Sequence, residues 1–156
     1  MPQSFPPHRP LHSILCVAVL TCASTASAVN SAELYTAEAY TYGRFDANLQ
    51  FAPGDGVVSS FFLWKDGSEK PDVFWNELDF EKIQDECLLK TNALYGSPGA
   101  NHNEAHDSDG DLCSTFHTYS YEWTPEYVAW FLDDVEIRRD TGDAATAFAE
   151  NTADGM

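Results

Sequence analysis

Three carboxylates stand at alternate positions near the middle of the chain, and they constrain its fold more than any other feature. Glu77, Asp79 and Glu81 alternate with Leu78 and Phe80. This period of two is typical of a β-strand that has acids on one face and apolar side chains on the other. Like charges on one strand face repel each other, so the pattern calls for an explanation. A solvated outer face is the simplest explanation, and a functional carboxylate cluster is the alternative.

The spacing of the two outer acids suits a catalytic pair. Cα atoms four residues apart on a strand lie ~13 Å apart, at about 3.3 Å per residue. If the Glu77 and Glu81 side chains lean toward each other, their carboxyl groups can come within about 5–6 Å, the separation that retaining glycosidases use. Glu77 would then be the nucleophile and Glu81 the general acid/base. Asp79 would hold or share a proton between them and keep their two pKa values apart.

Four segments of the chain resemble motifs of glycoside hydrolase family 16. Residues 75–81 resemble the active-site strand W-x-E-[ILV]-D-[IFV]-E, and residues 40–46 resemble the strand Y-x-Y-G-x-[YF]-E. Residues 56–62 resemble G-x-V-S-S-F-F, and residues 116–125 resemble F-H-T-Y-x-x-[DE]-W-x-P. The resemblance implies an all-β fold, a concanavalin-like β-jelly-roll sandwich of antiparallel strands with a glycan cleft on its concave face. It also implies hydrolysis or transfer of β-glucans with retention.

The resemblance further implies which side chains contact the polysaccharide. Phe62, Trp64 and Trp75 match family positions that line the cleft, where aromatic rings stack on sugar rings. Core packing is the alternative for each of these aromatic side chains. Asn92 resembles an asparagine of the family's cleft.

Two further candidates for sugar contacts lie on an earlier segment. Asp46 matches an acidic residue that binds a sugar hydroxyl, shortened here from Glu. Asn48 stands two residues later, where lichenases of the family commonly have Arg. Loss of that Arg removes a fork of hydrogen-bond donors, which puts the usual mixed-linkage glucan subsite in question.

The acid strand also indicates the branch of the family. Laminarinase- and agarase-type members usually insert a residue between the positions of Asp79 and Glu81, making a bulge, and this chain does not. The uninterrupted strand resembles the lichenase and xyloglucan-transglycosylase branches, and together with the signal-like residues 1–28 it indicates a secreted endo-β-1,3-1,4-glucanase, a lichenase. Hydrolysis of another β-glucan, transglycosylation on xyloglucan or another β-glucan, and a catalytically silent glycan-binding module are the alternatives. The intact acid trio disfavours the silent module, because a binding module has no need to hold three carboxylates together.

The charge balance bears on the partners. Eight Lys and Arg residues stand against 25 Asp and Glu, a formal net charge of −17. This argues against nucleic acid and anionic membranes, whose phosphates need basic partners, and it suits a neutral polysaccharide substrate. We expect a monomer that needs no cofactor.

Residues 1–28 are typical of a secretory signal peptide. The apolar run 14–20 is too short to span a membrane, and residues 26–28 form an A-x-A cleavage site. The mature protein would begin at Val29 and be extracellular. A lipoprotein with Cys22 as the lipidated residue is a weaker alternative.

The two remaining cysteines predict a disulfide between Cys87 and Cys113, since the compartment is oxidising. A metal site that includes His102 or His106 is the alternative, but it lacks a recognised ligand spacing, and we expect no metal ligands. Residues 107–111 resemble part of a calcium loop without its later Glu, so an acidic surface loop is the better interpretation. A structural calcium elsewhere stays possible, because the family often carries one.

The remaining pattern predicts the strands and loops. Residues 43–51 alternate cleanly, as a half-buried antiparallel strand does, whereas residues 57–64 are apolar on both faces and predict a central strand. We expect further strands at residues 83–94 (with a turn inside), 116–123, 127–132 and 135–139, a long loop at 96–110, a hairpin turn at Asp133-Asp134, and little strand pattern from Thr141 onward.

The position of the motifs predicts an unusual arrangement of the domain. Only a short segment separates the signal from the first motif, whereas in the family's common arrangement several strands precede it. Circularly permuted lichenases begin in this way. We therefore expect residues 29–156 to be a partial catalytic domain, permuted and broken off near Met156, with an incomplete sandwich.

Overall fold

A computed structural model describes residues 30–83, 87–106, 112–152 and 154–156. The chain divides into two compact units, residues 1–35 and residues 36–156. Residues 30–35 are exposed and have no regular secondary structure. All described strands and the described helix belong to the second unit.

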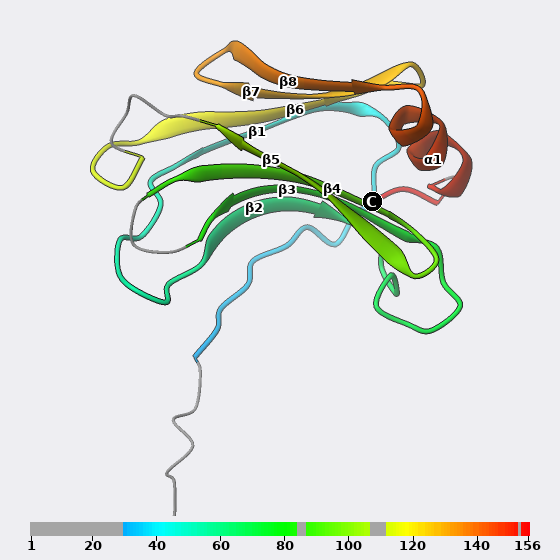
Figure 1. Cartoon of the computed structure of the whole chain (residues 1–156), viewed down its shortest axis with the longest axis horizontal. Helices are drawn as coiled ribbons and strands as arrows, with labels where there is room; N and C mark the ends of the chain where they lie inside the picture. Colours follow the sequence, from blue (N-terminus) through cyan, green and yellow to red (C-terminus); the bar gives the residue numbers. More distant parts are fainter. Residues whose placement is uncertain (1–29, 84–86, 107–111, 153) are drawn as a thin grey trace, which may run out of the picture. The chain divides into compact units, whose positions relative to one another are not determined.

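The second unit is a sandwich of two antiparallel sheets, as the sequence predicts. One sheet has the strand order β1-β6-β7-β8 and the other β2-β3-β4-β5, and Figure 1 shows them as two layers. The strands are β1 Gly43–Leu49, β2 Ser59–Trp64, β3 Trp75–Lys82, β4 Leu89–Gly96, β5 Gly99–His106, β6 His117–Trp123, β7 Tyr127–Leu132 and β8 Val135–Thr141.

The core lies between the two sheets and is rich in aromatic side chains. Leu78 and Phe80 of β3 and Tyr121 and Trp130 of the facing sheet are each 0% exposed. The polar ends of the two aromatic residues reach across the core to the acid strand: Tyr121 donates to the carbonyl of Leu78 at 3.1 Å, and Trp130 Nε1 donates to the carbonyl of Asp79 at 3.1 Å. Buried donors of this kind need partners, so these bonds fix the position of β3 against the facing sheet.

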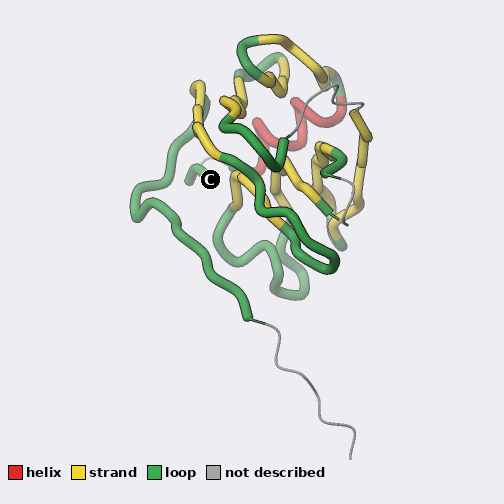
Figure 2. The backbone as a smooth tube through the Cα atoms, turned by 90° about the vertical axis from the view of Figure 1, so that its left-hand side faces the viewer, coloured by secondary structure: helices red, strands yellow, loops and turns green. Residues whose placement is uncertain are grey.

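A helix, α1 (Asp143–Asn151), follows the last strand, in the region where the sequence showed little strand pattern. It packs against β3, β4, β7 and β8, and Figure 2 shows it in red against the strands in yellow. Ala144, Ala145 and Phe148 are its buried residues, and the Phe148 ring packs edge-on against Tyr95 with centroids 5.8 Å apart. This i, i+1, i+4 spacing gives the helix its apolar face.

Two predicted connections are confirmed. Cys87 and Cys113 form a disulfide with Cα atoms 6.1 Å apart, so neither sulfur is free to bind a metal. Asp133 and Asp134 form the turn between β7 and β8, with φ of 49° and 63°. Asp133 Oδ1 accepts a hydrogen bond from the Thr118 main-chain N–H at 2.9 Å, which ties the turn to β6.

Two expectations about strands are wrong. Residues 99–106 form strand β5, within the segment 96–110 that was predicted to be a loop. Strand β2 lies at the end of the described sheet, beside β3 alone, and is not central. The apolar residues on both faces of β2 therefore do not indicate a central strand. One of these faces lies beside the acid row.

Several expectations fall outside the described residues or stay untested. The signal peptide 1–28 and the acidic segment 107–111 lie outside the described residues. Permutation and early termination of the domain stay predictions. Within the described part of the chain, no helix has the length and apolarity needed to cross a membrane.

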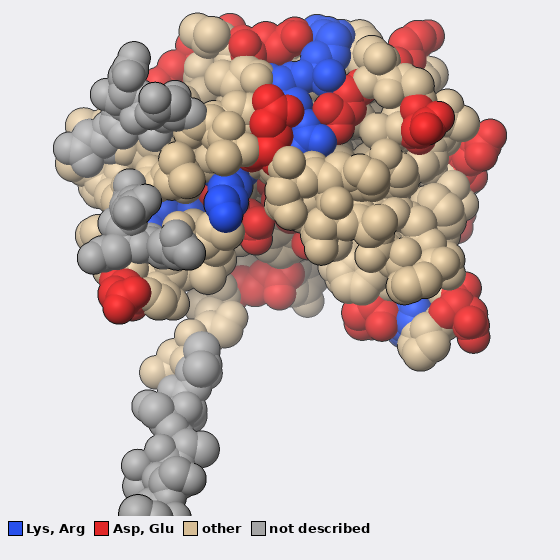
Figure 3. All heavy atoms as spheres, viewed as in Figure 1, with Lys and Arg blue, Asp and Glu red and all other residues tan. Residues whose placement is uncertain are grey.

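The surface agrees with the acidic composition. Asp and Glu side chains, red in Figure 3, are spread over the face shown there, whereas Lys and Arg side chains, blue, form a few small groups. Among the described residues, no group of three or more His, Cys, Asp or Glu side chains is arranged to hold a metal ion. We therefore assign no residues to the possible calcium.

Candidate active site

The acid row lies on the outer face of β3. Its burial alternates as the sequence predicts, with Leu78 and Phe80 fully buried toward the core. On the other face Glu77 and Glu81 are half-buried, and Asp79 is only 4% exposed. A solvated outer face would leave these carboxylates in water. The burial of all three therefore favours a functional cluster over a solvated face.

The register of the sheet places several predicted residues beside the acids. Residues directly paired across antiparallel strands share one face of the sheet. On β2 and β4 the partners are Trp64 for Glu77, Phe62 and Asn92 for Asp79, and Lys90 for Glu81. The structure thus brings the predicted residues of β2, β3 and β4 together on one face.

Trp75 contacts both the acid row and the neighbouring strand. Its indole Nε1 donates a hydrogen bond to Oε2 of Glu77 at 2.8 Å. Its ring packs edge-on against Trp64, with centroids 5.3 Å apart and an interplanar angle of 84°. Trp75 therefore orients the Glu77 carboxylate in addition to offering an aromatic surface.

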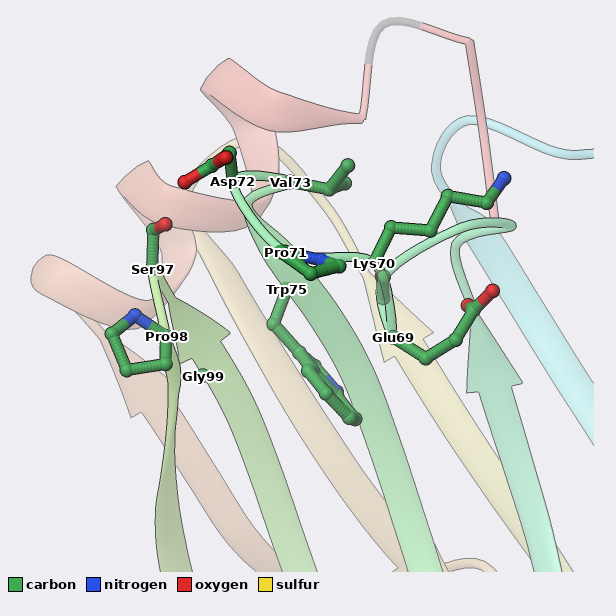
Figure 4. A pocket seen from close by; sticks show the side chains of 10 residues that line it. Glu69, Lys70, Pro71, Asp72, Val73, Trp75, Ser97, Pro98 and Gly99 are labelled. Carbon is green, nitrogen blue, oxygen red and sulfur yellow. The ribbon is translucent and has the colours of Figure 1, made fainter.

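A shallow pocket of about 420 Å³ adjoins the Trp75 end of the acid row. The loop of residues 68–73 and the turn of residues 97–99 form it, and Figure 4 shows the Trp75 ring between the two. Gly99 allows this close approach, because a Cβ atom there would lie 2.6 Å from Cγ of Trp75. The pocket extends the acid-bearing face beyond the carboxylates.

Asp79 is the most strongly perturbed acid of the row. Burial, followed by the negative charges of Glu77 and Glu81, raises the pKa of Asp79 to about 9. A hydrogen bond from Asn92 opposes this rise. At neutral pH Asp79 therefore carries a proton, and its hydrogen bond with Glu77 favours the proton on Asp79 and the charge on Glu77.

The two glutamates differ in what opposes their burial. Burial raises the pKa of Glu77, and the hydrogen bonds from Trp75 and Asp79 lower it again in part. Burial and then the charge of Glu77 raise the pKa of Glu81, while Lys90 lowers it. The Glu77 anion thus has two hydrogen-bond donors, whereas Glu81 faces the negative charge of Glu77. The environments push the two acids toward different protonation states.

Asp46 and Asn48 do not join this site. Both lie on β1, in the other sheet, where Phe45 and Leu49 pack against the core. Strand alternation then turns Asp46 and Asn48 away from the core, on the opposite outer surface of the sandwich. Asp46 pairs there with Arg44 at 2.9 Å, and Asn48 donates to the Thr118 hydroxyl at 3.1 Å.

Three polar residues on the acid-bearing face were not among the predicted site residues. Lys90 pairs with Glu81, and Asn103 pairs with Asn92, while Asn101 accepts a hydrogen bond from Asn92 at 2.9 Å. Lys90 lies two residues before Asn92, so strand alternation could have identified it. The two asparagines of β5 were lost because their segment was predicted to be a loop.

An antiparallel β-sandwich that carries a buried aspartate between two half-buried glutamates on one strand face, with aromatic side chains from β2 and β3 on the same face, fits a β-sandwich glycoside hydrolase. The chain belongs to glycosyl hydrolases family 16, whose family model matches residues 16–153. A β-glucanase of Fibrobacter succinogenes is 39% identical over 129 residues, which cover 80% of this chain and 37% of that protein.

Two solved structures resemble this protein. A β-1,3-1,4-glucanase (lichenase) derived from a mouse hindgut metagenome has a TM-score of 0.58 and 29% identity, covering 69% of this chain and 50% of that one. The β-glucanase of Bacillus licheniformis has a TM-score of 0.59 and 26% identity, with the same coverage. The chain thus spans half or less of the length of these relatives.

Proposed function

We propose that this protein is a retaining endo-β-glucanase that hydrolyses β-1,3-1,4-glucan. One observation carries the proposal: Asp79, almost fully buried, lies between two half-buried glutamates on one strand face, with the Trp75 indole on one of them. Relatives named β-glucanase and lichenase support the choice of substrate class.

Glu77 is the nucleophile of the proposed reaction. Trp75 and Asp79 both stabilise its anion, so it is the glutamate that ionises more readily next to a protonated Asp79. Its carboxylate attacks C1 of the sugar and forms a glycosyl ester, while the bond from C1 to the glycosidic oxygen breaks.

Glu81 is the general acid and then the general base. The charge of Glu77 favours the protonated form of Glu81, which gives its proton to the departing glycosidic oxygen. In the second step ionised Glu81 takes a proton from water as the water oxygen attacks C1. The ester bond breaks, Glu77 leaves as a carboxylate, and the product keeps the configuration of the substrate.

The aromatic side chains of β2 and β3 bind the glucan in this proposal. Phe62 and Trp64 share the acid face, and Trp75 lies at its end beside the pocket. Their rings offer apolar surfaces to the faces of sugar rings. These aromatic side chains only bind the glucan, whereas Glu77, Glu81 and water react with it.

The experiment that tests the proposal is release of reducing ends from barley β-glucan, laminarin and xyloglucan by the full-length protein. We expect the fastest release from barley β-glucan. Glu77→Gln should abolish this activity. Glu126→Gln, at an exposed position in the loop between β6 and β7, should retain it. Release from laminarin alone or from xyloglucan alone would refute the proposed specificity for β-1,3-1,4-glucan. Chain lengthening without net hydrolysis would indicate a transglycosylase, and glucan binding without turnover would indicate a silent module.

We also propose that the protein acts outside the cell. The signal-like residues 1–28 and the Cys87–Cys113 disulfide support this location. N-terminal sequencing of the exported protein should give Val29 as its first residue. Retention of residues 1–28 on a protein that stays in the cytoplasm would refute the proposal.

A further inference from the structure

Four aromatic residues of the facing sheet carry polar groups into the core, and two of these groups reach the acid strand. Tyr119, Tyr121 and Trp123 of β6 and Trp130 of β7 are each 0% exposed. The Tyr119 hydroxyl and the Trp123 indole N–H have no hydrogen-bond partner among the described residues. The polar groups of Tyr121 and Trp130 both donate to main-chain carbonyls of β3. The two groups that have partners therefore converge on the strand that carries the acids.

These two bonds reach successive residues of β3. The Tyr121 hydroxyl is shared between the carbonyl of Leu78 at 3.1 Å and the carbonyl of Phe61 on β2 at 2.5 Å. Trp130 Nε1 donates to the carbonyl of Asp79 at 3.1 Å. Successive carbonyls of a strand point to opposite sides of it, so one of these carbonyls faces β2 and the other faces β4. Strand β3 is thus held from the core on both of its sides.

The held residues lie at the centre of the acid row. Leu78 and Asp79 stand between Glu77 and Glu81, and Figure 1 shows β3 bowed with its convex side toward the facing sheet. On the concave outer face of a bowed strand, side chains four residues apart lean toward each other. The hydrogen bonds between the strands of one sheet run within that sheet and leave its bow free to change. Bonds from the facing sheet to the centre of β3 oppose a flattening of the strand.

We infer that Tyr121 and Trp130 are positioning residues of the active site: they hold the centre of β3 toward the facing sheet and thereby set the separation of the two catalytic glutamates. Retaining glycosidases need their two carboxyl groups about 5–5.5 Å apart. Both positioning residues are buried in the core and contact no substrate. The inference rests on the proposed function for its kinetic consequence.

The rings of both residues are themselves held in place. The Tyr121 ring packs on Phe80 of β3, with centroids 4.8 Å apart. The guanidinium group of Arg138 lies over the Trp130 ring, 4.4 Å from its centroid. Arg138 is anchored in turn, because its Nε donates to Oδ1 of Asp140 at 2.9 Å. The two donors therefore act from fixed positions.

The test replaces each positioning residue by Phe, which keeps an aromatic ring and removes the donor. The matched controls are Tyr119→Phe and Trp123→Phe, which remove a buried polar group that has no partner in the described structure. Tyr119 is a close match for Tyr121, because its ring also packs on Phe80, with centroids 5.3 Å apart. Removal of a polar group without a partner should not weaken the protein.

The kinetic arm measures the pH dependence of kcat/KM on barley β-glucan. In Tyr121→Phe and Trp130→Phe, kcat should fall about 3- to 10-fold with KM nearly unchanged, as expected when one hydrogen bond that positions the reacting groups is lost. Burial and then the charge of Glu77 raise the pKa of Glu81. In a flatter strand Glu77 lies farther away, so the basic limb should move to lower pH. Loss of stability alone would not move this limb.

Neither substitution changes a charge near the acids. Burial raises the pKa of Tyr121 well above its ordinary value, so its hydroxyl stays protonated. The titratable neighbours of Glu81 are Glu77 and Asp79 on its own strand and Lys90 on β4. Its partner on β2 is Ser60, which carries no charge. A shift of the basic limb in the variants therefore reports a change in geometry.

The outcomes separate this inference from the proposed function. If the wild type does not hydrolyse glucan, the proposed function fails, and ¹³C NMR titration of labelled carboxyl groups decides the inference. Glu81 should then titrate at lower pH in Tyr121→Phe and Trp130→Phe than in the wild type and both controls. Wild-type behaviour of the two folded variants, or the same change in a control, would overturn the inference. If Trp130→Phe does not fold, Tyr121→Phe decides, since it loses only one oxygen atom.

Discussion

The indole Nε1 of Trp75 lies 2.8 Å from Oε2 of Glu77 and donates a hydrogen bond to it. This bond makes an aromatic residue part of the electrostatics of the acid row. It lowers the pKa of Glu77 against the effect of burial. The proposed nucleophile is therefore kept available as an anion by a neighbour two residues before it on the same strand face.

Trp75→Phe tests this relationship. The substitution keeps an aromatic ring and removes the donor, so the pKa of Glu77 should rise and the acid limb of the kcat/KM profile should move to higher pH. Trp64→Phe is the control, because Trp64 lies on the same face and makes no hydrogen bond to an acid in the described structure. An acid limb at the wild-type position in Trp75→Phe would show that the bond does not tune Glu77.

Asp79→Asn should change how stability depends on pH. The pKa of Asp79 is about 9 in the folded protein and about 3.9 in an unfolded chain, so between these values the folded state holds a proton that the unfolded state has lost. Stability from this group is therefore complete below pH 4 and is lost as pH rises toward 9. Asparagine does not titrate and removes the effect.

The melting temperatures of Asp79→Asn and the wild type should therefore diverge in favour of the variant between pH 5 and pH 8. Asp46→Asn, at an exposed acid whose pKa is lowered, should not show this trend. Parallel curves for Asp79→Asn and the wild type would show that Asp79 is already ionised at neutral pH. Activity of Asp79→Asn should also fall, since Glu77 loses the proton-bearing neighbour.

The Cys87–Cys113 disulfide should contribute measurably to stability. It closes a loop with a sequence separation of 26 residues, for which the chain-entropy model gives roughly 3.5 kcal/mol. Thiol titration of the denatured, unreduced protein without residues 1–28 should find no free thiol, and reduction should lower the melting temperature. Two free thiols before reduction would contradict the bond.

The acid strand could be predicted because it has a period-two pattern, whereas the two-sheet sandwich was implied by the resemblance to glycoside hydrolase family 16. In β3 the alternation of Leu78 and Phe80 with acids fixes which side chains share a face, whatever the rest of the chain does. Phe45 and Leu49 mark β1 in the same way. These patterns are local, so one sequence suffices to read them.

The surface that Asp46 and Asn48 occupy, strand β5 and helix α1 could not be predicted, because the local sequence pattern does not determine them. Alternation shows that Asp46 and Asn48 share a face, but only the pairing of β1 with β6 shows which sheet and which surface they occupy. Strand β5 is exposed along most of its length, so burial leaves no periodic signal in it. Helix α1 is short, and its buried residues are Ala144, Ala145 and Phe148, so its apolar face gives only a weak signal.

Azide rescue of the two glutamate variants tests the central claim most directly, because it assigns the roles of Glu77 and Glu81 in one chemical product. Glu77→Ala and Glu81→Ala should each lose most activity on an activated β-glucoside, while Glu126→Ala should not. Azide should restore turnover of Glu77→Ala and give the α-glycosyl azide, since it attacks from the face that the nucleophile has vacated. With Glu81→Ala it should give the β-azide, because the ester on Glu77 still forms and azide then displaces it. Reversed anomers would contradict the assignment of the two roles, and full activity of both variants would contradict the proposed active site.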